Sequence, residues 1–217
     1  MSSVRCVLFD LDGTLYDSDE YSAYFDSEMT NLISDLLHLD KEDASKLLQA
    51  RRKEMGTLTR AVESLGVDRH EFHRLVAQRI DPALYLTPNE EARNAIRRLR
   101  ANGFRIGLVS NSGRSLVMKI LRALKLEPTS FDVIVTGTEV EPKPSHEPFE
   151  FALEKLGCDR EETVYVGDRD EAELRPAHEI GLRTILISRK DGQSSKWADR
   201  VIHEISELEK QIMVRER

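Results

Sequence analysis

The sequence predicts an α/β protein: a doubly wound parallel sheet into which an all-helical domain is inserted. Three observations lead to this prediction. Short, continuous apolar runs such as residues 7–9 are typical of strands that are buried on both faces. From residue 89 onward, such runs alternate with segments of helical periodicity, as repeated βα units do. Between residues 18 and 83 no strand-like run is found, although one helix is enough to join two parallel strands.

The 217 residues have an ordinary composition for a globular domain, with 40% hydrophobic and 33% charged residues. The net charge is −7 and there is no block of Lys and Arg, so we expect no nucleic-acid polymer as a partner. No run approaches the roughly 18 apolar residues of a spanning helix, and the first strand follows Met1 too closely to leave room for a signal peptide. We therefore expect a cytoplasmic monomer or homodimer without membrane contact.

Cys6 and Cys158 are the only cysteines, and each stands alone in the sequence. No C-x-x-C pair or His cluster indicates a zinc site, and two thiols do not form a disulfide framework. We expect a reducing, intracellular setting.

In the N-terminal part, a strand over residues 7–9 precedes four predicted helices. Residues 17–20 supply an N-cap and an acidic first turn, and apolar residues then recur every three or four positions from Tyr21 to Leu37. The remaining helices are expected over 41–56, 57–65 and 69–79. We assign residues 17–83 to this helical domain and residues 1–16 and 84–217 to the α/β core.

The C-terminal part is expected to alternate helices with strands. The predicted helices cover 90–101, 114–124, 147–156 and 176–180, with an amphipathic tail from Ile205. The predicted strands cover 106–109, 133–135, 163–166 and 184–187, with a weak one over 200–202.

The first strand ends at Asp10, and a second aspartate, Asp12, follows two residues later. In an open α/β sheet, ligands bind outside the carboxyl ends of the strands, so both carboxylates are expected to face a crevice. Gly13 lets the backbone turn tightly beside them. Two carboxylates this close repel each other unless a cation or a shared proton relieves them, and a hard ion such as Mg²⁺ is the simplest choice. The alternative is an ordinary polar turn.

Three later segments carry polar groups at equivalent places: Ser110-Asn111 and Asp168 end strands, and Lys143 lies in the loop after another. Each has a plainer explanation on its own, as a helix N-cap, a solvated lysine or an acidic surface turn. Because parallel strands end at one edge, their coincidence with Asp10 favours a single shared site.

These residues together resemble the motifs of the haloacid dehalogenase (HAD) superfamily of phosphotransferases, and the resemblance covers nearly the whole chain. The first motif, D-x-D-G-T, is present as residues 10–14. A Ser that ends the next strand matches Ser110, a Lys before a helix matches Lys143, and a strand that ends in Gly-Asp matches Asp168. The resemblance implies a HAD-type Rossmannoid core.

One position departs from the family pattern. Relatives commonly carry a second Asp, often after Asn, five residues beyond the Gly-Asp aspartate, where this chain has Ala172-Glu173. Glu173 keeps a carboxylate, and Asp170 is an alternative for the same role.

The resemblance also implies a mechanism in which Asp10 attacks phosphorus and forms an aspartyl-phosphate. Asp12 would protonate the leaving oxygen and then activate water, while Ser110 and Lys143 hold phosphate oxygens. The implied substrate-binding residues are Gly13, Thr14 and Asn111, and the implied Mg²⁺ ligands are Asp10, Asp12 (through its backbone carbonyl), Asp168 and Glu173.

The helical domain corresponds in this superfamily to a C1 cap, which closes over the site and selects the leaving group. Residues 53–58 resemble the cap loop of pyrimidine 5′-nucleotidase-like members, so Gly56 and Thr57 are further candidates for substrate binding. The alternative is a basic helix end with Gly56 as its C-cap. Three tyrosines either stack on a substrate ring or pack the cap on the core: Tyr16, Tyr21 and Tyr24.

The sequence therefore predicts a Mg²⁺-dependent hydrolase of phosphomonoesters that acts on a small phosphorylated metabolite. A nucleoside 5′-monophosphate is the favoured substrate, followed by phosphoglycolate or a sugar phosphate. The alternatives are a phosphomutase of a sugar phosphate and a non-catalytic phosphate-binding regulatory protein on the same fold. The acid at position 12 argues for hydrolysis, and against a 2-haloacid dehalogenase, which does not require it.

Overall fold

A computed structural model describes residues 3–189 and 192–213. Within these residues, six strands form one sheet in the order β3-β2-β1-β4-β5-β6, and every neighbouring pair is parallel. The predicted doubly wound parallel sheet is confirmed. The strands are β1 (Cys6–Phe9), β2 (Arg105–Ser110), β3 (Val133–Thr136), β4 (Thr163–Gly167), β5 (Arg183–Ile187) and β6 (Arg200–Ile202).

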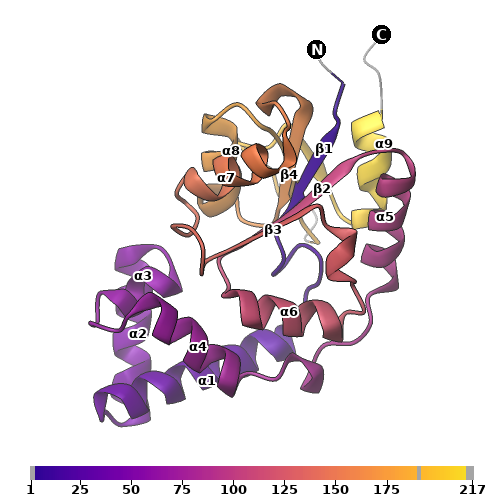
Figure 1. The fold of residues 1–217 in the computed structure, drawn as a ribbon. Helices are drawn as coiled ribbons and strands as arrows, with labels where there is room; N and C mark the ends of the chain where they lie inside the picture. Colours follow the sequence, from indigo (N-terminus) through magenta and orange to yellow (C-terminus); the bar gives the residue numbers. More distant parts are fainter. Residues whose placement is uncertain (1–2, 190–191, 214–217) are drawn as a thin grey trace.

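Helices cover both faces of the sheet. Alternate residues of each strand point to opposite faces, and the apolar side chains on each face are buried under helices. Val7 and Phe9 of β1 join the core that is formed with α5 (Glu90–Ala101), α6 (Arg114–Ala123) and α9 (Leu208–Met213). Cys6 and Leu8 pack instead with α7 (Glu147–Leu156) and α8 (Arg175–Glu179). Figure 1 shows these two helical layers on either side of the strands. Both faces of β1 are therefore buried, as its apolar run predicts.

The inserted segment is helical throughout, as predicted. Its helices are α1 (Asp19–Leu37), α2 (Lys41–Met55), α3 (Leu58–Glu63) and α4 (Arg69–Arg79), and they begin after the capping side chains of Ser18, Asp40, Thr57 and Asp68. The four helices lie together beside the sheet, and α4 packs on α6 of the core (Figure 1). The boundaries of a separate cap domain at residues 17 and 83 stay a prediction.

Short helical turns join the longer elements: η1 (Pro82–Leu84), η2 (Pro128–Ser130), η3 (Arg160–Glu162), η4 (Asp170–Leu174) and η5 (Ile205–Glu207). Most predicted elements agree with the structure to within one or two residues. The helix predicted over 176–180 agrees with α8 to within one residue, but the π-helix η4, which begins at Asp170 and is continuous with α8, was not predicted. The turn of η4 places Glu173 inside the protein.

The two cysteines, for which the sequence predicted no disulfide, are bonded to each other. Cys6 in β1 and Cys158 after α7 form a disulfide, with their Cα atoms 6.6 Å apart. The two residues are separated by 152 positions, and they meet because α7 packs on the face of the sheet to which Cys6 points. In the described ranges, none of the helices is long and apolar enough to cross a membrane. The cytoplasmic location expected from the sequence stays a prediction.

Candidate active site

The site lies where the chain order of the strands reverses. β1 sits between β2 and β4, so Asp10, Ser110 and Asp168 come from three adjacent strands at their carboxyl ends. The backbone N–H of Asp10 donates to the carbonyl of Val166 over 2.9 Å, which fixes the start of the loop after β1. Reversal points of this kind form a crevice in open α/β sheets. The predicted convergence of separate strand ends therefore holds for these residues.

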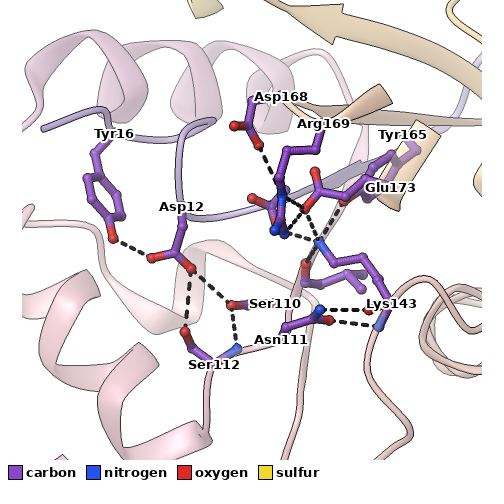
Figure 2. A network of polar contacts seen from close by, with 12 residues as sticks. Asp12, Tyr16, Ser110, Asn111, Ser112, Lys143, Tyr165, Asp168, Arg169 and Glu173 are labelled. Atoms are coloured by element: carbon purple, nitrogen blue, oxygen red, sulfur yellow. Dashed lines mark hydrogen bonds and ion pairs between the residues drawn. The ribbon is translucent and has the colours of Figure 1, made fainter. Parts of the chain in front are cut away.

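Lys143 is fully buried at the centre of the site and is not a solvated loop lysine. Its ammonium group donates to Asp10 Oδ1, to Glu173 Oε1 at 3.1 Å, to the Tyr165 hydroxyl at 2.9 Å and to the Val109 carbonyl at 3.1 Å. Figure 2 shows Lys143 reaching toward Tyr165 and Glu173. Burial alone would lower the pKa of Lys143, but the charges of Asp10 and Glu173 raise it. Lys143 is thus a fixed positive charge.

The side chain of Asn111 holds the loop that carries Lys143. Its amide nitrogen donates to the Lys143 carbonyl over 2.9 Å, and its amide oxygen accepts from the Lys143 N–H over 2.8 Å. Both polar ends of the amide are engaged in this way (Figure 2). Asn111 therefore positions the lysine, and the predicted contact of Asn111 with substrate stays a prediction.

Three carboxylates form a compact acidic cluster. One oxygen each from Asp10, Asp168 and Glu173 lies within 4.8 Å of the others. Each of the three also has a buried oxygen for which the described part of the chain offers no hydrogen-bond partner: Asp10 Oδ2, Asp168 Oδ1 and Glu173 Oε2. Buried carboxylate oxygens that lack donors are the ligands that a hard divalent cation requires. The residues present therefore fit a divalent metal.

The electrostatics of the cluster also favour an added positive charge. Burial, followed by the charge of Glu173, raises the pKa of Asp10 well above its usual value and that of Asp168 to about 7. Burial also acts to raise the pKa of Glu173, but Lys143 and Arg169 together bring it below its usual value. A metal ion would relieve the repulsion between Asp10, Asp168 and Glu173.

Glu173, not Asp170, is the acid that reaches the cluster. The Asp170 carboxylate instead accepts a hydrogen bond from the Ser195 hydroxyl. The Glu173 carboxylate forms ion pairs with Lys143 and with Arg169, which lies four residues earlier in the chain. Arg169 is not among the site residues predicted from the sequence; its i,i+4 spacing to Glu173 is the signal that could have indicated this pair.

The Asp12 carboxylate lies beside the acidic cluster and has contacts of its own. Its Oδ1 accepts from the Tyr16 hydroxyl, and its Oδ2 lies 3.5 Å from the hydroxyls of Ser110 and Ser112 (Figure 2). Ser110 in turn accepts from the Ser112 N–H over 3.1 Å. The contribution of the Asp12 carbonyl to a metal site stays a prediction.

Gly13 and Thr14 lie in the loop that follows β1. Gly13 has a φ of 83°, and a Cβ at this position would overlap the Asp168 carboxylate, so glycine is required for the close approach. The Thr14 hydroxyl is buried, and the described residues offer it no hydrogen-bond partner. Substrate binding by Gly13 and Thr14 stays a prediction.

The two cap residues have local structural roles. Gly56 adopts a left-handed conformation with a φ of 79° as the C-cap of α2, which is the alternative considered from the sequence. The Thr57 hydroxyl accepts from the Arg60 N–H as the N-cap of α3. Substrate binding by Gly56 and Thr57 stays a prediction.

An acidic cluster and a buried lysine at the reversal point of a parallel sheet define the class to which this chain belongs, the haloacid dehalogenase-like hydrolases. The sequence model of that family matches residues 7–187, which confirms the predicted superfamily.

Individual relatives agree with this assignment. The chain is 28% identical to a glyceraldehyde 3-phosphate phosphatase of Methanocaldococcus jannaschii, over 94% of this chain and 95% of that one. It is 32% identical to a phosphoglycolate phosphatase of Aquifex aeolicus, over 84% of each chain. The crystal structure of a HAD phosphatase from Thermococcus onnurineus shares the fold with a TM-score of 0.72, at 22% identity over 97% of this chain and 98% of that one. The predicted class of enzyme, a phosphatase, agrees with all three names.

Proposed function

We propose that this chain is a Mg²⁺-dependent phosphatase that hydrolyses a small phosphorylated metabolite through an aspartyl-phosphate on Asp10. The observation that carries the proposal is the environment of Asp10. Its carboxylate is buried at the carboxyl edge of the sheet, Lys143 holds one oxygen, and the other has no hydrogen-bond partner among the described residues. A carboxylate fixed in this way can attack phosphorus in line with one of its oxygens, while its other oxygen contributes to the proposed metal site.

The two chemical steps need one nucleophile and one acid–base group. Asp10 forms a bond to phosphorus while the bond from phosphorus to the leaving oxygen breaks, and Asp12 gives that oxygen a proton. Asp12 then takes a proton from the water that attacks the aspartyl-phosphate, which restores Asp10 and releases phosphate. Tyr16 and Ser110 hold the Asp12 carboxyl in position for both transfers.

The remaining residues neutralise and orient the phosphate. Asp10, Asp168 and Glu173 would hold the metal ion, for which we propose Mg²⁺; when bound, it neutralises charge on the phosphate oxygens. Lys143 supplies a second positive charge, and the Ser110 and Thr14 hydroxyls offer hydrogen bonds.

The substrate that we propose is a phosphorylated two- or three-carbon metabolite. Two relatives are named for glyceraldehyde 3-phosphate and phosphoglycolate, which are both small phosphomonoesters. A nucleoside 5′-monophosphate ranks second, because Gly56 and Thr57, on which that prediction rested, serve as helix caps.

The test is phosphate release by the purified chain from a panel of phosphomonoesters that includes both classes, with Mg²⁺ or with EDTA. We expect release that requires the metal and that falls on the order of 10³-fold or more in Asp10→Asn. Asp159→Asn is the control and should retain activity, because Asp159 is exposed and is not one of the site residues.

Unchanged turnover in Asp10→Asn would contradict the proposal, as would release that EDTA does not affect. Phosphate that returns to the substrate at a second position, with none released to water, would instead indicate a phosphomutase.

A further inference from the structure

One buried polar atom near the site is not used by the proposed mechanism: the hydroxyl of Tyr21. Tyr21 lies in the first turn of α1, directly after the catalytic loop, and is only 3% exposed. Its hydroxyl oxygen is buried, and no group in the described residues accepts or donates a hydrogen bond there. Leaving a buried hydroxyl unpaired costs free energy, so such atoms in native structures call for an explanation.

The neighbouring tyrosines have partners and show that packing alone does not explain this hydroxyl. Tyr16 donates to Asp12, and Tyr24, on the same helix as Tyr21, donates to the Arg79 carbonyl over 3.3 Å and accepts from the Asp81 N–H over 3.2 Å. The rings contact one another edge-on or tilted, with centroids 5.8 Å apart for Tyr16 and Tyr21 and 6.4 Å apart for Tyr21 and Tyr24. A phenylalanine would make the same ring contacts as Tyr21 without an unpaired oxygen.

Tyr21 lies close to Asp12, the proposed acid for the leaving oxygen. Tyr21 packs against Tyr16, whose hydroxyl contacts the proposed acid, and Asp12 is the charged group with the largest effect on Tyr21. Burial first, and then the Asp12 charge, raise the pKa of Tyr21, so the hydroxyl keeps its proton at neutral pH and is a hydrogen-bond donor. In the proposed reaction, the atoms next to Asp12 are the leaving oxygen and the carbon chain attached to it.

We propose that the Tyr21 hydroxyl binds the leaving group of the substrate, by donating a hydrogen bond to an oxygen that this group carries beside its ester carbon. The inference rests on the proposed phosphatase function and deepens it. The substrate class is a phosphomonoester whose leaving group bears a hydroxyl, carbonyl or carboxylate oxygen near the ester. A buried donor that has no partner until substrate binds rejects analogues that lack the matching oxygen.

The experiment compares phosphomonoesters of equal carbon number with and without oxygen on the leaving group. The pairs are phosphoglycolate with ethyl phosphate, and glyceraldehyde 3-phosphate with propyl phosphate, each assayed with wild type and Tyr21→Phe in Mg²⁺. We expect the wild type to prefer the oxygen-bearing member of a pair. In Tyr21→Phe, kcat/KM for that member should fall about 10- to 100-fold, while kcat/KM for the alkyl phosphate changes less than about twofold.

A second measurement separates binding from a structural role. Because the hydroxyl has no partner among the described residues, the melting temperature of Tyr21→Phe should equal or exceed that of wild type. Tyr24→Phe is the matched control, since it removes a hydroxyl from the same helix whose partners, Arg79 and Asp81, lie at the far end of α4. It should lose some stability and keep the wild-type preference between substrates.

Several results would overturn the inference while the phosphatase proposal stands. They are equal use of both members of each pair by wild type, an equal loss on both members in Tyr21→Phe, or a marked loss of stability in that variant. Absence of metal-dependent release from every ester, or full activity of Asp10→Asn, would instead remove the phosphatase proposal and the inference with it.

Discussion

Among the single residues of the site, Glu173 is the one whose role the sequence left open. Its carboxylate is fully buried between Lys143 and Arg169, and one of its oxygens belongs to the acidic cluster. Asp170 is committed to Ser195. The extra methylene of glutamate, compared with aspartate, is accommodated by the π-helical turn η4, which carries the residue under the edge of the sheet.

We expect Glu173→Gln to weaken apparent Mg²⁺ affinity by about 10- to 100-fold, because the cluster loses a charged oxygen that supports the metal. The measurement is the Mg²⁺ dependence of phosphate release, with the melting temperature as a check on folding. Asp170→Asn is the matched control and should leave this dependence within about twofold of wild type. The opposite ranking of the two variants would assign the metal site to Asp170.

At the scale of an element, α4 connects the helical segment to the core through a buried histidine. His73 is 7% exposed, and its side chain fills the space beside Gly113 and Gly137: an added Cβ would lie 2.7 Å from the His73 Cβ at Gly113 and 3.1 Å from its Nε2 at Gly137. Burial lowers the pKa of His73 from 6.5 to about 4. Two glycines in the core loops are therefore what allow α4 to dock this closely.

This pKa predicts a pH-dependent contribution of His73 to stability. The unfolded chain takes up the proton more readily, so the contribution is complete above about pH 6.5 and is lost as the pH falls toward 4. The largest loss is about 3 kcal/mol. The free energy of unfolding, measured in urea at pH 7.5 and pH 4.5, should fall less with acid in His73→Phe than in wild type.

His70→Phe, at an exposed position of the same helix, should show the wild-type pH dependence. Parallel pH profiles for wild type and His73→Phe would show that His73 does not titrate in this way.

At the scale of the whole molecule, a network of ion pairs joins the helical segment to the loop that carries Lys143. Glu141 accepts from Arg60 of α3 over 2.8 Å and from Arg69 of α4, which also pairs with Glu63 over 2.8 Å. Glu141 precedes Lys143 by two residues in the same loop. The position of the helical segment and that of Lys143 are thus linked through one carboxylate.

We expect Glu141→Gln to lower kcat/KM several-fold, because weaker docking of the helical segment exposes the site to water. Since the pairs are partly exposed, the free energy of unfolding should change by only about 1 kcal/mol. Glu54→Gln breaks a pair with Arg51 that lies within α2, and it is the control. An equal loss of kcat/KM in both variants, or none in Glu141→Gln, would contradict a role of this network in catalysis.

High salt supplies a further readout of the same network. Because salt screens exposed ion pairs, the difference in kcat/KM between wild type and Glu141→Gln should shrink as ionic strength rises.

Local patterns in the sequence determined most of the fold and the main site residues. Apolar runs mark strands, and spacings of three and four mark helices. Ser110 ends its strand, and Asp10 and Asp168 directly follow theirs. Parallel strands end at one edge, so even residues far apart in the chain are predictable as neighbours. These properties depend on each segment alone and on a rule that all parallel sheets obey.

Only the tertiary structure decided which side chains meet within that frame. It selected Glu173 over Asp170 through a π-helical turn, joined Cys6 to Cys158, and made helix caps of Gly56 and Thr57. It also left the Tyr21 hydroxyl buried without a partner in the described residues. Contacts of this kind depend on how helices pack over distances of a few ångströms, and neither periodicity nor the spacing of motifs contains that information.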